Sequence, residues 1–304
     1  MKTLISGEYR TLEMSSKKLY RGIDVFKLIA AFGIVAVHTG INFLNTLGRI
    51  GVPFFVIISS FFFFQHYFKL SNAEKRKEYV KKFVKRLCLL FLTWKFFYIP
   101  LALREYVKIN FERGFTIKTL LVYVFDFFYP VPSNANGYGF LTHWSTLGTY
   151  GFPRVFIYIY IGMLIAKFRN KINEYSFKKC FGCFSSILIL FLIENFIIGI
   201  LGGVFTSEEV VTTAPTALVG SLVAIKWQPN IANTVNARNF STFLYCAQQW
   251  EIVVWRSFIH IFSITFLEMN LIEFMFVVIS SYIFYLLYRW IRNKTKWKFW
   301  TYMV

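Results

Sequence analysis

Long apolar runs, separated by short and mostly basic polar segments, make up most of this chain. A helix crosses the hydrocarbon core of a bilayer with about 20 residues, and about eight of the runs approach that length. The pattern predicts an all-α fold, a polytopic bundle of transmembrane helices. The expected spans are residues 23–43, 51–68, 83–103, 151–167, 184–203, 214–227, 240–266 and 271–291.

The basic segments predict how these helices are oriented. With eight spans, every basic segment lies on the same side of the membrane, which the positive-inside rule makes the cytoplasmic side. We therefore expect a cytoplasmic N-terminal segment over residues 1–22, one integral membrane domain over 23–291, and a cytoplasmic basic tail over 292–304. The basic segments are residues 17–21, 69–86, 167–179, 226–238 and 289–298.

One further apolar segment, residues 117–131, is too short to cross the membrane comfortably and contains Asp126. Counting it as a span would reverse every later loop and place the basic ones outside. We expect a short interfacial or re-entrant segment on the outer side. The first apolar run lacks a small-residue cleavage site, so no cleavable signal peptide is expected, and the protein is predicted to be a multi-pass protein of the cell membrane.

Composition supports the membrane location and limits the partners. Of the 304 residues, 56% are hydrophobic and 16% charged, and a water-soluble domain could not bury so much apolar surface. The net charge of +19 comes from the segments between spans, so it is interpreted as topology, with membrane lipid and not nucleic acid as the partner. Cys180 and Cys183 form a CxxC pair, but no second pair completes a structural zinc site, and no metal is expected.

The first expected span carries Asp24, Lys27 and His38 in an otherwise apolar run. Ionisable groups inside a span are costly and point to function. Lys27 and His38 lie on nearly the same helix face, about 16 Å apart along the axis. Alternatively, His38 is a packing residue bonded to a backbone carbonyl, while Lys27 reaches the headgroups or pairs with Asp24.

Polar residues also interrupt the seventh span, at Gln248, Gln249 and Glu251. So much polarity in a membrane requires partners or a wet cavity. We expect these side chains to line the same cavity as His38, or else to form hydrogen bonds between helices. Glu194, in the fifth span, is another candidate for a buried carboxyl group.

Two segments, RGIDVFKLIAAFGIVAVHTG and LGRIGVPFFVIISSFFFF, resemble the opening of the acyltransferase-3 family. These bacterial membrane proteins move acyl groups, usually acetyl, onto sugars and other envelope acceptors. The family histidine of the first helix is His38 here, and the arginine before the second run is Arg49. The chain departs from the family pattern in three ways: Lys27 replaces an arginine, Gln248 stands where a histidine is expected after Tyr245, and the middle section is shorter.

The resemblance implies an O-acyltransferase that moves an acyl group, usually acetyl, from a cytoplasmic acyl-CoA to a hydroxyl of an envelope carbohydrate or similar acceptor. In this scheme His38 is the base, and Lys27 holds a phosphate or carbonyl of acetyl-CoA or another acyl-CoA. No metal takes part. The expected substrate-binding residues are Asp24, Arg49, Tyr245, Gln248 and Glu251.

Two other interpretations stay open, a transporter or other non-catalytic membrane protein and a catalytically decayed member of the family. Around its first two helices the chain also resembles the membrane domain of serine racemases linked to vancomycin resistance, which implies movement of an amino acid. The absence of the expected histidine at Gln248, together with the shorter middle section, favours this non-catalytic class.

Overall fold

The computed structural model describes residues 20–113, 116–117, 152–201, 210–232, 234–264, 269–295 and 297. Within these residues the regular structure is helical, which confirms the all-α class. The predicted N-terminal segment up to residue 19, the basic tail beyond 297 and most of the segment 117–131 lie outside the described residues.

Each expected span overlaps a helix, although the count of eight spans stays a prediction. Helices long and apolar enough to cross a membrane are Arg21–Thr39, Phe43–Tyr67, Phe177–Ile200 and Asn270–Thr295. The long helices are α2 (Arg21–Thr39), α4 (Gly51–Tyr67), α5 (Ala73–Arg113), α8 (Phe152–Lys167), α10 (Phe177–Ile200), α11 (Thr213–Lys226), α12 (Thr234–Phe262) and α13 (Asn270–Thr295), and the short ones are α3 (Asn42–Gly48) and α9 (Arg169–Glu174).

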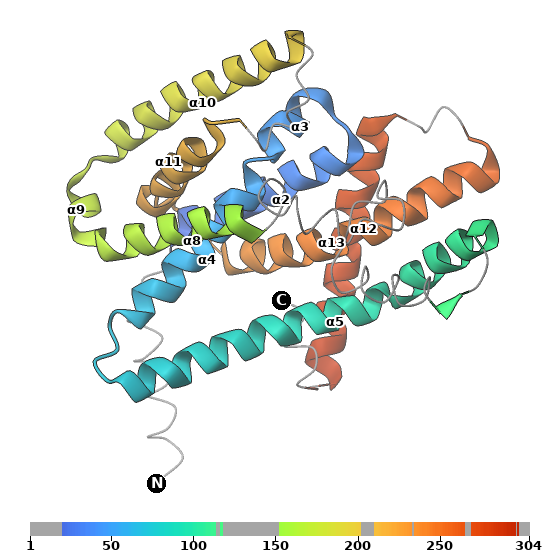
Figure 1. Ribbon diagram of the computed structural model, residues 1–304, viewed down its shortest axis with the longest axis horizontal. Coiled ribbons are helices and arrows are strands. Elements are labelled where there is room, and N and C mark those ends of the chain that lie inside the picture. Colours follow the sequence, from blue (N-terminus) through green and yellow to red (C-terminus); the bar gives the residue numbers. More distant parts are fainter. Residues whose placement is uncertain are drawn as a thin grey trace.

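Helix α2 lies at the centre of the bundle, against α3, α4, α11, α12 and α13 (Figure 1). One of its faces carries Ala31 and Val35 into a core shared with α5, α12 and α13. Another carries Ile23 into a core shared with α4, α8 and α11. All three side chains are fully buried, so the helix that holds the ionisable residues is also the common wall of both cores.

Two glycines determine how α2 ends and how the chain continues. Gly40 adopts a left-handed conformation, with φ of 75°, and its N–H donates to the Ala36 carbonyl, as is common after a helix C-terminus. The short helix α3 then packs back on α2, where Gly48 meets Gly33 so closely that a Cβ atom on Gly48 would overlap the Gly33 carbonyl.

The third expected span differs most from the structure. Residues 83–103 were expected to form it, but α5 is one helix of 41 residues from Ala73 to Arg113, so most of the expected basic loop over residues 69–86 is helical. Lysine, arginine and glutamate favour helix, and the first part of α5 contains no proline, since Pro100 lies further along the same helix. At 1.5 Å per residue α5 is about 60 Å long, about twice the hydrocarbon thickness of a bilayer.

Helix α10 forms an outer edge of the bundle, beside α11 (Figure 1). Within it, Cys180 and Phe191 are buried, whereas large apolar side chains such as Phe196 and Ile200 are more than 60% exposed. An apolar surface of this kind fits contact with lipid. The CxxC pair lies at the start of α10, and both thiols are free.

Candidate functional site

The helix α2 places Lys27 and His38 on one face, near opposite ends. Between them, Ala31 and Val35 are fully buried against Leu244 of α12 and other core residues. Apolar side chains therefore fill the space between the two polar ends. We call these ends the basic end, around Lys27, and the His38 end.

The basic end gathers charges from three helices. The Asp24 carboxylate is 3% exposed, and its Oδ1 lies 3.9 Å from a guanidinium nitrogen of Arg238 on α12. Thr234 of α12 also bonds to this carboxylate. Lys27 lies close enough to Asp24, Arg238 and Arg86 of α5 to interact electrostatically with each of them. The basic end thus holds three cations and one carboxylate.

Two aromatic rings extend the basic end towards the middle of the bundle. The Lys27 Nζ atom lies 6.0 Å from the centroid of the Phe55 ring of α4, at the outer limit of a cation–π contact. The Phe55 ring lies 5.7 Å from that of Tyr245 on α12. Tyr245 is 42% exposed. The structure therefore brings together three of the predicted site residues, Asp24, Lys27 and Tyr245.

The His38 end is built around one arginine. His38 is exposed, in the last turn of α2, and its carbonyl accepts a hydrogen bond of 3.1 Å from Arg256 of α12. Arg256 also donates to both carboxylate oxygens of Glu273 on α13, at 2.7 and 3.4 Å. Asn270 donates to the Gly40 carbonyl at 2.8 Å. These bonds tie the end of α2 to α12 and α13.

Arg49, between α3 and α4, is connected to the same end of α2. Its Nε donates to the Asn45 side-chain oxygen at 3.0 Å, and the Asn45 amide donates to the Val37 carbonyl at 3.4 Å. Arg49 is thus fixed near the last turns of α2. The structure places it towards His38 and not towards Lys27.

The predicted polar residues of α12 are deeply buried. Gln248 is 3% and Glu251 4% exposed, and the Gln248 amide donates to the Tyr245 carbonyl at 3.3 Å. The Ser281 side chain of α13 lies close to the Glu251 carboxyl group. Among the described residues, Gln248 Oε1, Glu251 Oε2 and Trp255 Nε1 make no hydrogen bond of normal geometry. Burying such atoms without partners is costly, so we expect water or a ligand to meet them.

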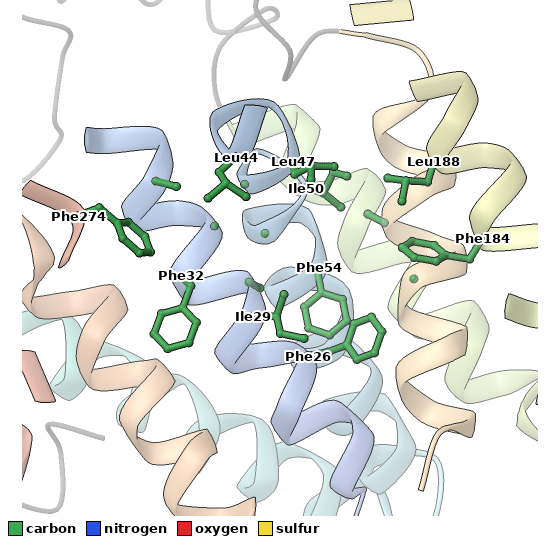
Figure 2. Close-up of a pocket in the computed structure, with 17 residues that line it drawn as sticks. Phe26, Ile29, Phe32, Leu44, Leu47, Ile50, Phe54, Phe184, Leu188 and Phe274 are labelled. Carbon is green, nitrogen blue, oxygen red and sulfur yellow. The ribbon is translucent and has the colours of Figure 1, made fainter. Parts of the chain in front are cut away.

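Two apolar cavities lie between the helices. Figure 2 shows the first, of about 380 Å³, with aromatic side chains of α2, α4 and α10 around it, Phe26, Phe54 and Phe184 among them. It borders the face of α2 that carries Ile29, about 180° from His38. The second, of about 620 Å³, lies between α5, α12 and α13, and Glu251 lines it. His38 lines neither of these two cavities, so a cavity shared by His38 and Glu251 stays a prediction.

A family model for the acyltransferase domain matches residues 20–115. This segment is similar to the acyltransferase-3 family, and we call it the acyltransferase-3 segment. The match confirms the resemblance found in the sequence, and it contains α2, α3, α4 and α5. Of the predicted site residues, those of α2 and Arg49 lie inside the acyltransferase-3 segment, whereas Tyr245, Gln248 and Glu251 lie beyond it.

Two racemases also share short stretches with the chain. An amino-acid racemase of Enterococcus faecalis is 39% identical over 79 residues, which are 23% of this chain and 11% of that protein. A serine/alanine racemase of Enterococcus gallinarum is 29% identical over 113 residues, 34% of this chain and 16% of that protein. The matches thus span less than a fifth of these relatives' length. No solved structure matches the chain.

Several residues around the acyltransferase-3 segment were missed by sequence reasoning. Arg238 was interpreted only as part of a basic cytoplasmic segment, whereas in the structure it faces Asp24. Arg256 and Glu273 are charged residues inside expected spans, and this feature points to function for them as it does for Lys27. What the sequence could not indicate is that they pair with each other and with the end of α2.

Glu194 has a different role from the one expected. Its carboxylate accepts hydrogen bonds from the backbone N–H groups of Val211 and Thr212, at 2.9 and 3.0 Å, and from the Thr212 hydroxyl. These residues directly precede α11. A carboxylate at a helix N-terminus satisfies free N–H groups and the helix dipole, so Glu194 stabilises the start of α11.

Proposed function

We propose that the protein is an integral membrane O-acyltransferase that moves an acetyl or similar acyl group from a cytoplasmic acyl-CoA to a hydroxyl of an envelope carbohydrate or similar acceptor. The observation that carries this proposal is the pair of Lys27 and His38 on one face of α2, inside the acyltransferase-3 segment. Each residue lies in a distinct polar cluster, so donor and acceptor groups have separate places to bind.

The basic end is the proposed donor site. Coenzyme A carries phosphate groups, and charge-assisted hydrogen bonds from lysine and arginine are the usual way that proteins hold them. Lys27, Arg86 and Arg238 supply three cations around the one carboxylate of Asp24. The positive-inside rule places this end at the cytoplasm, where acyl-CoA is available.

The His38 end is the proposed place of acyl transfer. The His38 imidazole takes the proton of the acceptor hydroxyl while the hydroxyl oxygen attacks the thioester carbonyl carbon. The carbon–sulfur bond then breaks, and His38 returns the proton to the leaving thiolate. Arg49, fixed near the same turns of α2, is suited to donating to the acceptor or to the carbonyl oxygen as it becomes negative.

The distance between the two ends sets a condition on the donor. The arm between the phosphates and the thioester must span about 16 Å along α2. Because Ala31 and Val35 are fully buried between the ends, this arm must run beside them. The scheme needs no metal.

Transfer of radiolabelled acetyl from acetyl-CoA to envelope material tests the proposal, using membranes that contain the native protein or His38→Ala. Loss of a general base slows a reaction by about 10²–10⁴-fold, so transfer should fall to background. His66→Ala is the matched control, since His66 is also exposed in the last turn of a helix, α4. Equal transfer by the native protein and His38→Ala would refute the role of His38.

A second candidate function is transport of a small polar molecule. Among the described residues, Gln248 Oε1 is an acceptor and Trp255 Nε1 a donor without a hydrogen-bond partner, which fits a ligand with both kinds of group, such as an amino acid. Both racemase relatives carry names that refer to amino acids. Uptake of labelled serine by cells with and without the protein tests this candidate, and equal uptake would rule it out for serine.

A further inference from the structure

The cavity between α5, α12 and α13 has the size and walls of a ligand site. Its volume is about 620 Å³, within the range of about 300–1,000 Å³ that is common for small-molecule pockets. The described residues that line it are almost all apolar or aromatic, including Trp94, Phe243 and Phe276, and Glu251 is the one charged side chain among them.

The cavity is long, and its outer side is open. It follows α13 from Phe276 to Ile291, which is about 22 Å at the rise of an α-helix. Val254, Ile283 and Phe284 line it and are 50%, 58% and 52% exposed. In a membrane these side chains meet lipid, so a hydrocarbon chain can enter sideways from the bilayer and lie along the helix.

Glu251 gives this apolar cavity one specific feature. The residue is only 4% exposed and lines the cavity. The Ser281 side chain lies close to its carboxyl group, but Glu251 Oε2 makes no hydrogen bond of normal geometry among the described residues. Buried polar atoms in folded proteins are nearly always hydrogen-bonded. We propose that the cavity binds a membrane amphiphile whose hydrocarbon chain lies along the apolar walls and whose hydroxyl group hydrogen-bonds to Glu251.

A hydroxyl group fits Glu251 better than a charged group does. A hydroxyl donates to a carboxylate and accepts from a carboxylic acid, so it satisfies Glu251 in either state. An ammonium group would place two desolvated charges in an apolar cavity, which is costly, and a second carboxylate would meet a like charge. The inference goes beyond acyl transfer, since binding in this cavity requires neither His38 nor an acyl donor.

Photolabelling of the full-length protein in lipid nanodiscs tests the proposal without any acyl donor. Two diazirine probes of equal chain length are compared, a long-chain alcohol and the corresponding alkane, and labelled peptides are identified by mass spectrometry. One hydrogen bond to a buried carboxyl group should favour the alcohol about fivefold to tenfold at the cavity residues of α12 and α13. On the exposed surface of α10, around Phe196, the two probes should label equally.

Three variants distinguish the effect of the hydrogen bond to Glu251 from the effect of the cavity volume. Glu251→Gln keeps a hydrogen-bonding side chain and should retain the preference for the alcohol. Glu251→Leu should lose the preference while both probes still label the cavity, and Ala247→Trp, which fills the space, should reduce labelling by both. Two results with the native protein would overturn the proposal, whether or not a variant folds. One is equal labelling of the cavity by the alcohol and the alkane. The other is labelling of the cavity that is no stronger than labelling of α10. Neither result would bear on acyl transfer.

Discussion

The two ends of α2 are held by different arrangements of charge. At the His38 end one arginine and one glutamate form a close pair, with 2.7 Å between Arg256 Nε and Glu273 Oε1. At the basic end the nearest pair, Arg238 and Asp24, is 3.9 Å apart, and Lys27 and Arg86 add positive charge beside it.

The difference shows which end is suited to an anionic ligand. A balanced, close pair has its electrostatic attraction satisfied within the protein and mainly fixes geometry. An excess of cations around one carboxylate leaves positive potential that an incoming anion can use. We therefore expect changes at the His38 end to affect the positions of helices, and changes at the basic end to affect donor binding.

Breaking the close pair should have the largest effect on stability. Arg256→Ala leaves the Glu273 carboxylate, which is 7% exposed, without its partner and removes the bond to the His38 carbonyl. Losing a hydrogen-bonded partner of a buried charge costs about 2 kcal/mol, which thermal unfolding in detergent would detect. Arg104→Ala is the control. Arg104 of α5 is exposed, and its side chain donates one long hydrogen bond, of 3.4 Å, to Ser257 of α12. Equal stability of the two variants would mean that the pair does not hold α2.

Neutralising Lys27 should weaken binding of the acyl-CoA donor and leave the rate of acyl transfer intact. Lys27→Gln keeps a polar side chain, one atom shorter, but removes its charge. Loss of one charge-assisted bond to a phosphate should raise the KM for acyl-CoA about fivefold to tenfold, with kcat nearly unchanged. Lys27→Arg should keep the KM low. A fall in kcat at constant KM would instead place Lys27 in the chemical step.

Substitution of Gly40 tests the turn that ends α2 beside His38. Gly40→Ala puts a side chain at φ of 75°, where its Cβ would lie 3.3 Å from the Asn270 amide nitrogen. The conformational cost is about 1 kcal/mol, so unfolding in detergent should occur at a lower temperature. Gly182→Ala, on α10 where no described atom beyond the adjoining residues and helix backbone lies within 4 Å of the added Cβ, should not destabilise the protein. Equal destabilisation by both variants would contradict a special role for Gly40.

The hydrophobic pattern predicted where helices lie because each apolar run must be buried or meet lipid. It gave residues 23–43 for the first span, and α2 ends a few residues earlier because Gly40 turns the chain. The same pattern did not predict the first part of α5, because a highly charged helix contains no apolar run. Helix propensity, and not hydrophobicity, was the informative property there.

The candidate site was predictable only in part, for a similar reason. Lys27 and His38 share a helix, so their common face follows from 3.6 residues per turn. The contacts of Asp24 with Arg238 and of Arg256 with Glu273 join different helices. Their partners depend on how each helix is rotated and crossed in the bundle, which periodicity along one chain segment does not determine.

The smallest expected effect comes from the one carboxylate of the basic end. Asp24→Asn keeps the shape and the contact with Thr234 but removes the negative charge beside Lys27 and Arg238. The positive potential then rises, so the KM for acyl-CoA should fall about twofold to threefold, because Arg238 is 41% exposed and its charge is partly screened. Measuring the KM at low and high salt checks the cause, because added salt should reduce the difference. A rise in KM would mean that Asp24 orients the cations, and the contrast between the two ends would then lie in geometry instead of net charge.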